Sequence, residues 1–127
     1  MIAINDEPLF QRFLAASILL SVLQNSLLTA RRAVNAVVYE EQHGEMKPFY
    51  ERISLAENLS VAAKKAMKAA GANLLDNDHV ETFYRLAHRS CQEAVSALDF
   101  AIEKRGVGRN WSVLRDHLKG AASTLSI

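Results

Sequence analysis

Histidine and cysteine are the most obvious side chains in this sequence for holding a metal ion or exchanging a proton near neutral pH. The chain has four histidines and one cysteine. His88 and Cys91 stand three residues apart, as ligands on one helical face would, but a zinc site needs further protein ligands. Glu40 and His43 have the spacing of one carboxylate–histidine pair, whereas a di-iron centre in a bundle uses two such pairs and more glutamates. The sequence therefore predicts no metal site and no cofactor.

The residues that open the last predicted helix suggest a different chemistry. Arg109 and Asn110 precede this helix, and His117 lies on it. An arginine, a polar residue and then a histidine resemble the motif of HEPN-type ribonucleases, which are small all-α bundles, although the spacer before His117 is longer here. The resemblance implies RNA cleavage by a dimer with Arg109 and His117 near its interface. We prefer the alternative in which Asn110 caps the helix, Arg109 is solvated and His117 borders the core, so no residue is assigned a catalytic role.

Basic side chains form a patch around the junction of the third and fourth predicted helices. The patch consists of Lys104, Arg105, Arg109, Arg115 and Lys119. Lys104 and Arg105 end a helix, where the helix dipole attracts cations. The whole chain has 15 basic and 14 acidic residues, a formal charge of +1, whereas proteins that grip the phosphates of nucleic acid are strongly basic. An RNA- or DNA-binding accessory role is therefore a less favoured alternative.

Length and composition predict one all-α domain over residues 1–127. Hydrophobic residues make up 50% of the 127 positions, and only two prolines and five glycines could interrupt helices. In four stretches the hydrophobic residues recur every three or four positions, which is the spacing of one helical face. The stretches begin at Asn5 or Asp6, Pro48, Asp78 and Asn110, and the first three end near Gly44, Gly71 and Gly106. We therefore expect an up-and-down bundle of about four helices with a long first helix.

Each stretch has one apolar face that should form the core. The four faces are Leu9, Phe13, Ala16, Leu20, Leu23, Leu27, Ala30, Val34 and Val38; Phe49, Ile53, Ala56, Leu59, Ala63, Met67 and Ala70; Val80, Tyr84, Ala87, Cys91, Val95, Leu98 and Ile102; and Trp111, Leu114, Leu118, Ala121 and Leu125. Six alanines between Ala56 and Ala70 make the second face small, so the second helix should approach a neighbour closely. Asp78 and Glu81 have the spacing of a capping box, which predicts that Asp78 caps the third helix.

The first stretch also has an apolar strip that its core face does not include. Leu14, Ile18 and Val22 lie four residues apart, roughly opposite that face, and Phe100 likewise points away from the core face of the third stretch. Large apolar patches are rare on soluble monomers, and two-fold dimers commonly bury them. We therefore expect a homodimer that associates through Leu14, Ile18, Val22 and Phe100. The alternative is that the third and fourth helices wrap around the first and cover both of its apolar sides.

Cysteine content and hydropathy favour a cytoplasmic protein without a membrane span. One cysteine cannot form an internal disulfide, which fits a reducing compartment. The apolar run from Phe13 to Leu23 is eleven residues long, too short to cross a bilayer. The leading functional hypothesis is thus a non-enzymatic, homodimeric helical bundle that acts by binding a protein partner whose identity is unknown.

Overall fold

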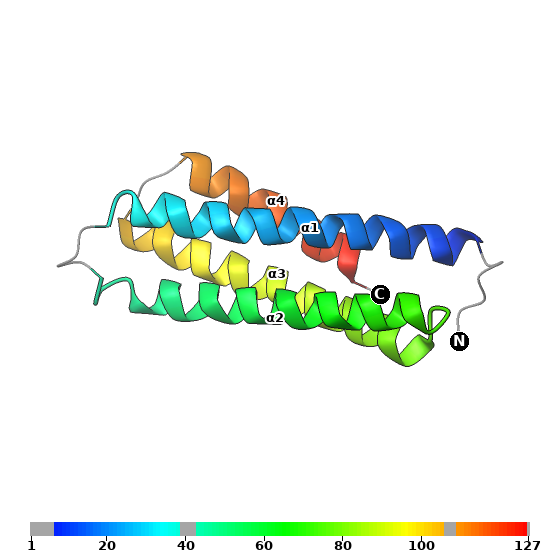
Figure 1. The fold of residues 1–127 in the computed structure, drawn as a ribbon. Coiled ribbons are helices and arrows are strands. Elements are labelled where there is room, and N and C mark those ends of the chain that lie inside the picture. Colours follow the sequence, from blue (N-terminus) through cyan, green and yellow to red (C-terminus); the bar gives the residue numbers. More distant parts are fainter. Residues whose placement is uncertain (1–6, 39–42, 106–108, 127) are drawn as a thin grey trace.

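The computed structural model describes residues 7–38, 43–105 and 109–126 and contains four α-helices in these ranges. They are α1 (Glu7–Asn35), α2 (Lys47–Ala72), α3 (Asn77–Arg105) and α4 (Arg109–Leu125). Consecutive helices run in opposite directions, and α4 returns alongside α1 (Figure 1). The described residues include no β-strand. The prediction of an all-α, up-and-down bundle with a long first helix is confirmed.

The four predicted core faces meet inside the bundle. Every predicted core residue is buried or packs against the buried cluster, except Leu9, which is 38% exposed. Phe13 of α1 meets Phe83 of α3 edge to face, with ring centroids 5.5 Å apart. Phe83 was not among the predicted core residues, and neither was Ser90, yet both are fully buried. The reason is that α3 packs against all three other helices and so buries a wider face than one stripe.

The α2 and α3 helices approach each other more closely than any other pair, as the alanine-rich face predicts. The Ser90 hydroxyl of α3 donates a hydrogen bond to the Ala56 carbonyl of α2, with 2.6 Å between the oxygens. Because the serine side chain has only one heavy atom beyond Cβ, this bond requires the two backbones to lie close together. Ala63 and Ala70 extend this contact and are fully buried.

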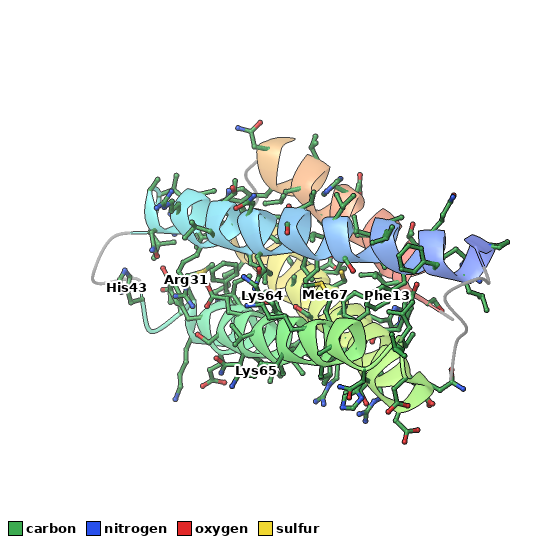
Figure 2. The ribbon with its side chains drawn as sticks, turned by 45° about the vertical axis from the view of Figure 1, so that its right-hand side comes forward. Phe13, Arg31, His43, Lys64, Lys65 and Met67 are labelled. Carbon is green, nitrogen blue, oxygen red and sulfur yellow. The ribbon has the colours of Figure 1, made fainter. Side chains whose placement is uncertain are left out.

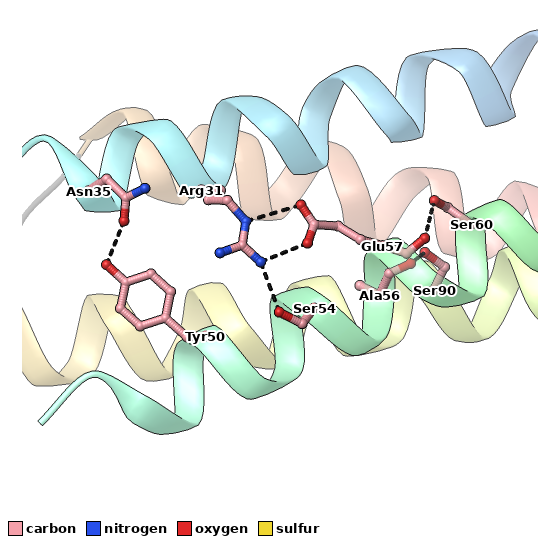
Figure 3. A network of polar contacts seen from close by, with 8 residues as sticks. All are labelled: Arg31, Asn35, Tyr50, Ser54, Ala56, Glu57, Ser60 and Ser90. Atoms are coloured by element: carbon pink, nitrogen blue, oxygen red, sulfur yellow. Dashed lines mark hydrogen bonds and ion pairs between the residues drawn. The ribbon is translucent and has the colours of Figure 1, made fainter. Parts of the chain in front are cut away.

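A row of polar contacts joins α1 to α2 and sets their antiparallel register (Figure 3). The Tyr50 hydroxyl donates to the Asn35 side chain across 2.6 Å. Arg31 reaches the Glu57 carboxylate at 2.7 and 3.1 Å and donates to the Ser54 hydroxyl at 2.9 Å. Further along, the Gln24 amide donates to the Ser60 hydroxyl at 3.5 Å. Residues of α1 therefore lie beside residues of α2 in reverse order.

The first helix ends earlier than predicted, at Asn35 rather than near Gly44. Residues 36 and 37 form a turn, in which the amides of Val37 and Val38 both donate to the Val34 carbonyl. The branched side chains of Val37 and Val38 lower the helical tendency of this segment, and the turn brings Val38 back into the core. Asn5 and Asp6, the predicted start, lie outside the described residues.

The cap of α3 also differs from the prediction. Asp76, not Asp78, caps the helix, because its carboxylate accepts a hydrogen bond from the Asp78 amide at 3.1 Å. Asp78 therefore lies in the first turn, and the predicted capping box with Glu81 is wrong. The preceding residues Leu74 and Leu75 have φ values of 54° and 58°, a left-handed conformation that reverses the chain quickly and starts α3 earlier. Similarly, α4 begins at Arg109, so Asn110 lies within the helix.

Candidate self-association surface

The strip formed by Leu14, Ile18 and Val22 lies on the outer surface of α1. Their exposed fractions are 45%, 69% and 37%. Because they are spaced by four residues, they form a ridge along the helix. No helix of the described chain covers this ridge, so the alternative in which α3 and α4 wrap both apolar sides of α1 is wrong.

The surface around the strip has no charged side chain from α1 over five helical turns. The eighteen residues from Phe13 to Ala30 contain no lysine, arginine, aspartate or glutamate, and Arg12 and Arg31 bound this span. Small polar side chains such as Ser21 and Asn25 occupy the exposed positions between the apolar ones. An uncharged helix face of this length can enter a protein interface without a large desolvation cost.

The uncharged surface continues from α1 onto α4. Val113, His117, Gly120 and Thr124 are exposed and recur at three- and four-residue spacing, so they lie along one flank of α4. The α1–α4 groove, a shallow hollow of about 380 Å³, lies between the two helices and is lined by Thr29, Ala33, Asn110, Trp111, Val113, Leu114 and His117. Thr29 follows Val22 by two helical turns, so the groove prolongs the strip.

The opposite edge of the strip carries positive charge from α2. One side of α2 contacts α1 through Tyr50, Ser54 and Glu57. By their three- and four-residue spacing, the same side also carries Val61, Lys64 and Lys68. Lys64 and Lys68 are exposed and form no ion pair with another described residue. Figure 2 shows Lys64 on the side of α2 nearest α1, and Lys65, about 100° further around the helix, pointing away from α1. We call Lys64 and Lys68 the lysine pair.

Phe100 does not join the strip. It is half-buried against the core and lines a separate shallow hollow of about 300 Å³ with Glu103 and Lys104. The Ser90–Ala56 contact sets the register of α3 against α2 and places Phe100 beside the start of α2, far from Leu14. The structure therefore does not support Phe100 as part of one surface with Leu14, Ile18 and Val22.

Arg109, the first residue of the ribonuclease-like motif, opens α4. His117, the last residue of the motif, lies about two helical turns further along. His117 is exposed and lines the α1–α4 groove next to Trp111, and the Arg109 side chain lies outside the described part. No group of three histidine, cysteine or acidic side chains able to hold a metal occurs among the described residues.

Acidic residues interrupt the predicted basic patch. Arg115 lies 3.2 Å from Asp99 of α3 and 3.2 Å from Asp116, and its hydrogen bond to Asp99 raises its pKa above the ordinary value. Lys104 and Lys119 are exposed, and Arg105 is half-buried. Of the five predicted cations, therefore, at least Arg115 is neutralised within the chain.

His88 and Cys91 serve the packing of α3. The Nδ1 atom of His88 lies 2.8 Å from the Ala122 carbonyl oxygen of α4. Cys91 is fully buried, and burial raises the pKa of its thiol to about 12. Metal ligation by cysteine requires the thiolate, which this environment disfavours.

Within the part of the chain that is described, α1 is long and apolar enough to cross a membrane by length and composition alone. The stretch Pro8–Asn35 has 28 residues, and its most apolar window has a mean hydropathy of 1.6. It is longer than the expected run from Phe13 to Leu23, because the helix continues on both sides of that run through polar residues, among them Arg12, Arg31 and Arg32. Core helices of soluble bundles and signal sequences meet the same criterion, and 39% of this window is buried in the bundle.

No protein-family model matches this chain, and neither curated proteins nor solved structures give a match. Its function therefore has to follow from the chemistry of the surfaces described above.

Proposed function

We propose that this protein is a non-enzymatic helical bundle that forms a homodimer through α1 and acts by binding another protein. The observation that carries the proposal is the position of Ile18, which is 69% exposed at the centre of the strip. Burying a side chain such as Leu14, Ile18 or Val22 contributes roughly 1.5 to 3 kcal/mol. A two-fold partner buries each of them twice, once in each copy.

The extent of the uncharged surface also favours a protein partner. A stable protein interface buries about 800 Å² on each partner, which is more than three side chains supply. The exposed flank of α4, with Val113, Gly120 and Thr124, widens the surface from one helix to two. Faces built from two helices are a common way for bundles to pack together.

The two other functions have weaker support. A ribonuclease would need His117 at a polar cleft, whereas His117 lines a mainly apolar groove. A nucleic-acid accessory protein would use the basic patch, in which Arg115 is paired with Asp99 and Asp116. We also propose a cytoplasmic location, because the lone cysteine, Cys91, is buried and suits a reducing compartment.

The test is the mass of the purified protein in solution, measured by light scattering after gel filtration. We expect wild type at twice the chain mass of 14.1 kDa and Val22→Glu at the mass of a folded monomer. Leu55→Glu is the matched control, because Leu55 and Val22 are both 37% exposed, but Leu55 projects from a side of α2 that does not border the strip. This control should remain dimeric.

Ile18→Glu is the second variant and should also be monomeric, with an unchanged helical spectrum. A wild-type protein that stays monomeric at all accessible concentrations would end the proposal. A dimer that survives both Val22→Glu and Ile18→Glu would show that association uses another surface.

A further inference from the structure

The two edges of the uncharged surface differ in charge, and this difference constrains how a second copy can dock. Along one edge lies the lysine pair of α2, Lys64 and Lys68. Ser60 contacts Gln24, so Lys64, one turn later in α2, lies beside Ser21 of α1, and Lys68 lies one turn closer to Leu14. The other edge is the flank of α4 formed by Val113, His117, Gly120 and Thr124, none of which is a lysine, an arginine or an acidic residue.

The α4 edge ends in a helix terminus close to the strip. Asn110 to His117 lie beside Thr29 and Ala33, and α4 runs antiparallel to α1 (Figure 1). Because Phe13 lies against Phe83 and Ala122 against His88, the last turns of α4 are level with the middle of the strip. The last turn of α4 has no basic side chain, whereas Arg32 stands in the last turn of α1. The terminal carbonyls of a helix carry partial negative charge and attract cations.

A two-fold axis in the interface can place two such surfaces face to face in two limiting orientations. If the axis lies in the interface and crosses α1, the two α1 helices are antiparallel and each α2 edge faces the α2 edge of the other copy. The lysine pairs of both copies then oppose each other, which is unfavourable. If the axis runs along α1, the helices are parallel and each α2 edge faces the α4 edge of the other copy.

We infer that two copies dock with their α1 helices parallel, so that Lys64 and Lys68 of each copy lie against the C-terminal end of α4 in the other. This inference rests on the proposed homodimer and adds the relative orientation of its two chains. It combines the apolar contact of the two strips with charge complementarity at both edges. Arg12 and Arg32 lie outside the uncharged span and need not enter a contact centred on Ile18.

The arrangement is tested by cysteine cross-linking in a Cys91→Ala background. In the parallel dimer each residue of the strip lies near the same residue of the other chain. Leu14→Cys and Val22→Cys should therefore each form a cross-linked dimer under oxidation or with a short bis-maleimide. These positions are about 12 Å apart along α1. In an antiparallel dimer, at most one of them can lie close to its copy.

The parallel arrangement would be overturned if at most one of the two variants cross-linked to itself while Leu14→Cys cross-linked efficiently in a mixture with Val22→Cys or Thr29→Cys. The proposed homodimer would survive that result. A wild-type protein that is monomeric would overturn both.

Charge reversal tests the edge contact separately. We expect Lys64→Glu to raise the dimer dissociation constant several-fold, because it replaces attraction to the end of α4 by repulsion. Added salt should weaken the wild-type dimer for the same reason. Lys65→Glu is the matched control, since the Lys65 side chain points away from α1 (Figure 2), and it should leave the constant unchanged. A tighter dimer in Lys64→Glu, or in high salt, would show that the lysine pairs repel each other and would overturn the inference.

Discussion

Ser90 of α3 and Ala56 of α2 are joined by a hydrogen bond between a side-chain hydroxyl and the backbone of the other helix. The two oxygens lie 2.6 Å apart, and both residues are fully buried. Only small side chains fit where two helices approach this closely. The α2–α3 pair is thus the most tightly packed part of the bundle, and α1 and α4 are arranged around it.

Enlarging Ser90 should destabilise the protein strongly. We expect Ser90→Leu to lower the free energy of unfolding by about 2 to 4 kcal/mol, because it overpacks the contact and removes the hydrogen bond. Ser90→Ala loses only the hydrogen bond and should cost about 1 kcal/mol. Gln92→Leu, at an exposed position of the same helix, is the control and should change little. Urea unfolding followed by circular dichroism measures all three, and a Ser90→Leu protein as stable as wild type would contradict the close approach.

The Cys91 thiol should be unreactive in the folded protein. Burial raises its pKa to about 12 from an ordinary value of 9.0, and the thiolate is the reactive form. We expect no reaction of native protein with Ellman's reagent at pH 8 and one reactive thiol per chain in guanidinium. Rapid labelling of the native protein would show that Cys91 is accessible.

The same pKa shift predicts a loss of stability in alkali. The folded protein holds the Cys91 proton up to about pH 12, whereas the unfolded chain releases it above about pH 9. The contribution of this proton is therefore complete below pH 9 and decreases as the pH rises from 9 to 12. Burial also raises the pKa values of Tyr50 and Tyr84, so these residues add to the loss at higher pH. Unfolding of Cys91→Ala, measured beside wild type, isolates the cysteine, and this variant should show a shallower decrease.

The helices could be predicted from the sequence because their apolar faces repeat regularly, but their ends could not. The end of α1 depends on a turn and on the contact of Asn35 with Tyr50, fifteen residues away. The start of α3 depends on the left-handed conformation of Leu74 and Leu75, which no local pattern in the sequence indicates. Both are features of the folded chain and have no regular spacing.

The candidate surface was predictable only in part. The four-residue spacing placed Leu14, Ile18 and Val22 on one ridge, but whether another helix covered them depended on the packing. The position of Lys64 beside that ridge follows from the α1–α2 register, to which the Gln24–Ser60 contact belongs. Phe100 was assigned to the same surface because sequence spacing shows which way a side chain points from its helix and not which helix lies next to it.

His117 should have no catalytic role. It is exposed on α4, so we expect His117→Ala to change the free energy of unfolding by less than about 0.5 kcal/mol. Purified wild-type protein should not cleave single-stranded RNA, as judged by gel electrophoresis. If wild type cleaves RNA and a folded His117→Ala protein does not, the ribonuclease hypothesis replaces the proposed function.

The ion pair between Arg31 and Glu57 should contribute modestly to holding α1 on α2. Its two hydrogen bonds measure 2.7 and 3.1 Å, and the side chains are 29% and 34% exposed, so water screens part of the attraction. A double-mutant cycle of Arg31→Ala and Glu57→Ala should give a coupling of about 0.5 to 1 kcal/mol that decreases in high salt. The cycle is required because Arg31 also bonds Ser54, so the single variant removes more than the ion pair.

The pair Lys47–Glu51 provides the control for that cycle. Its atoms are 3.7 Å apart, and its side chains are 75% and 65% exposed, so its coupling should be smaller than that of Arg31 and Glu57. Both cycles are measured by chemical unfolding at low and high salt. Equal coupling in the two pairs would show that the two-pronged geometry of Arg31 and Glu57 adds nothing. In that case the attachment of α1 to α2 would depend on the buried residues of the two helices, among them Leu27 and Ile53.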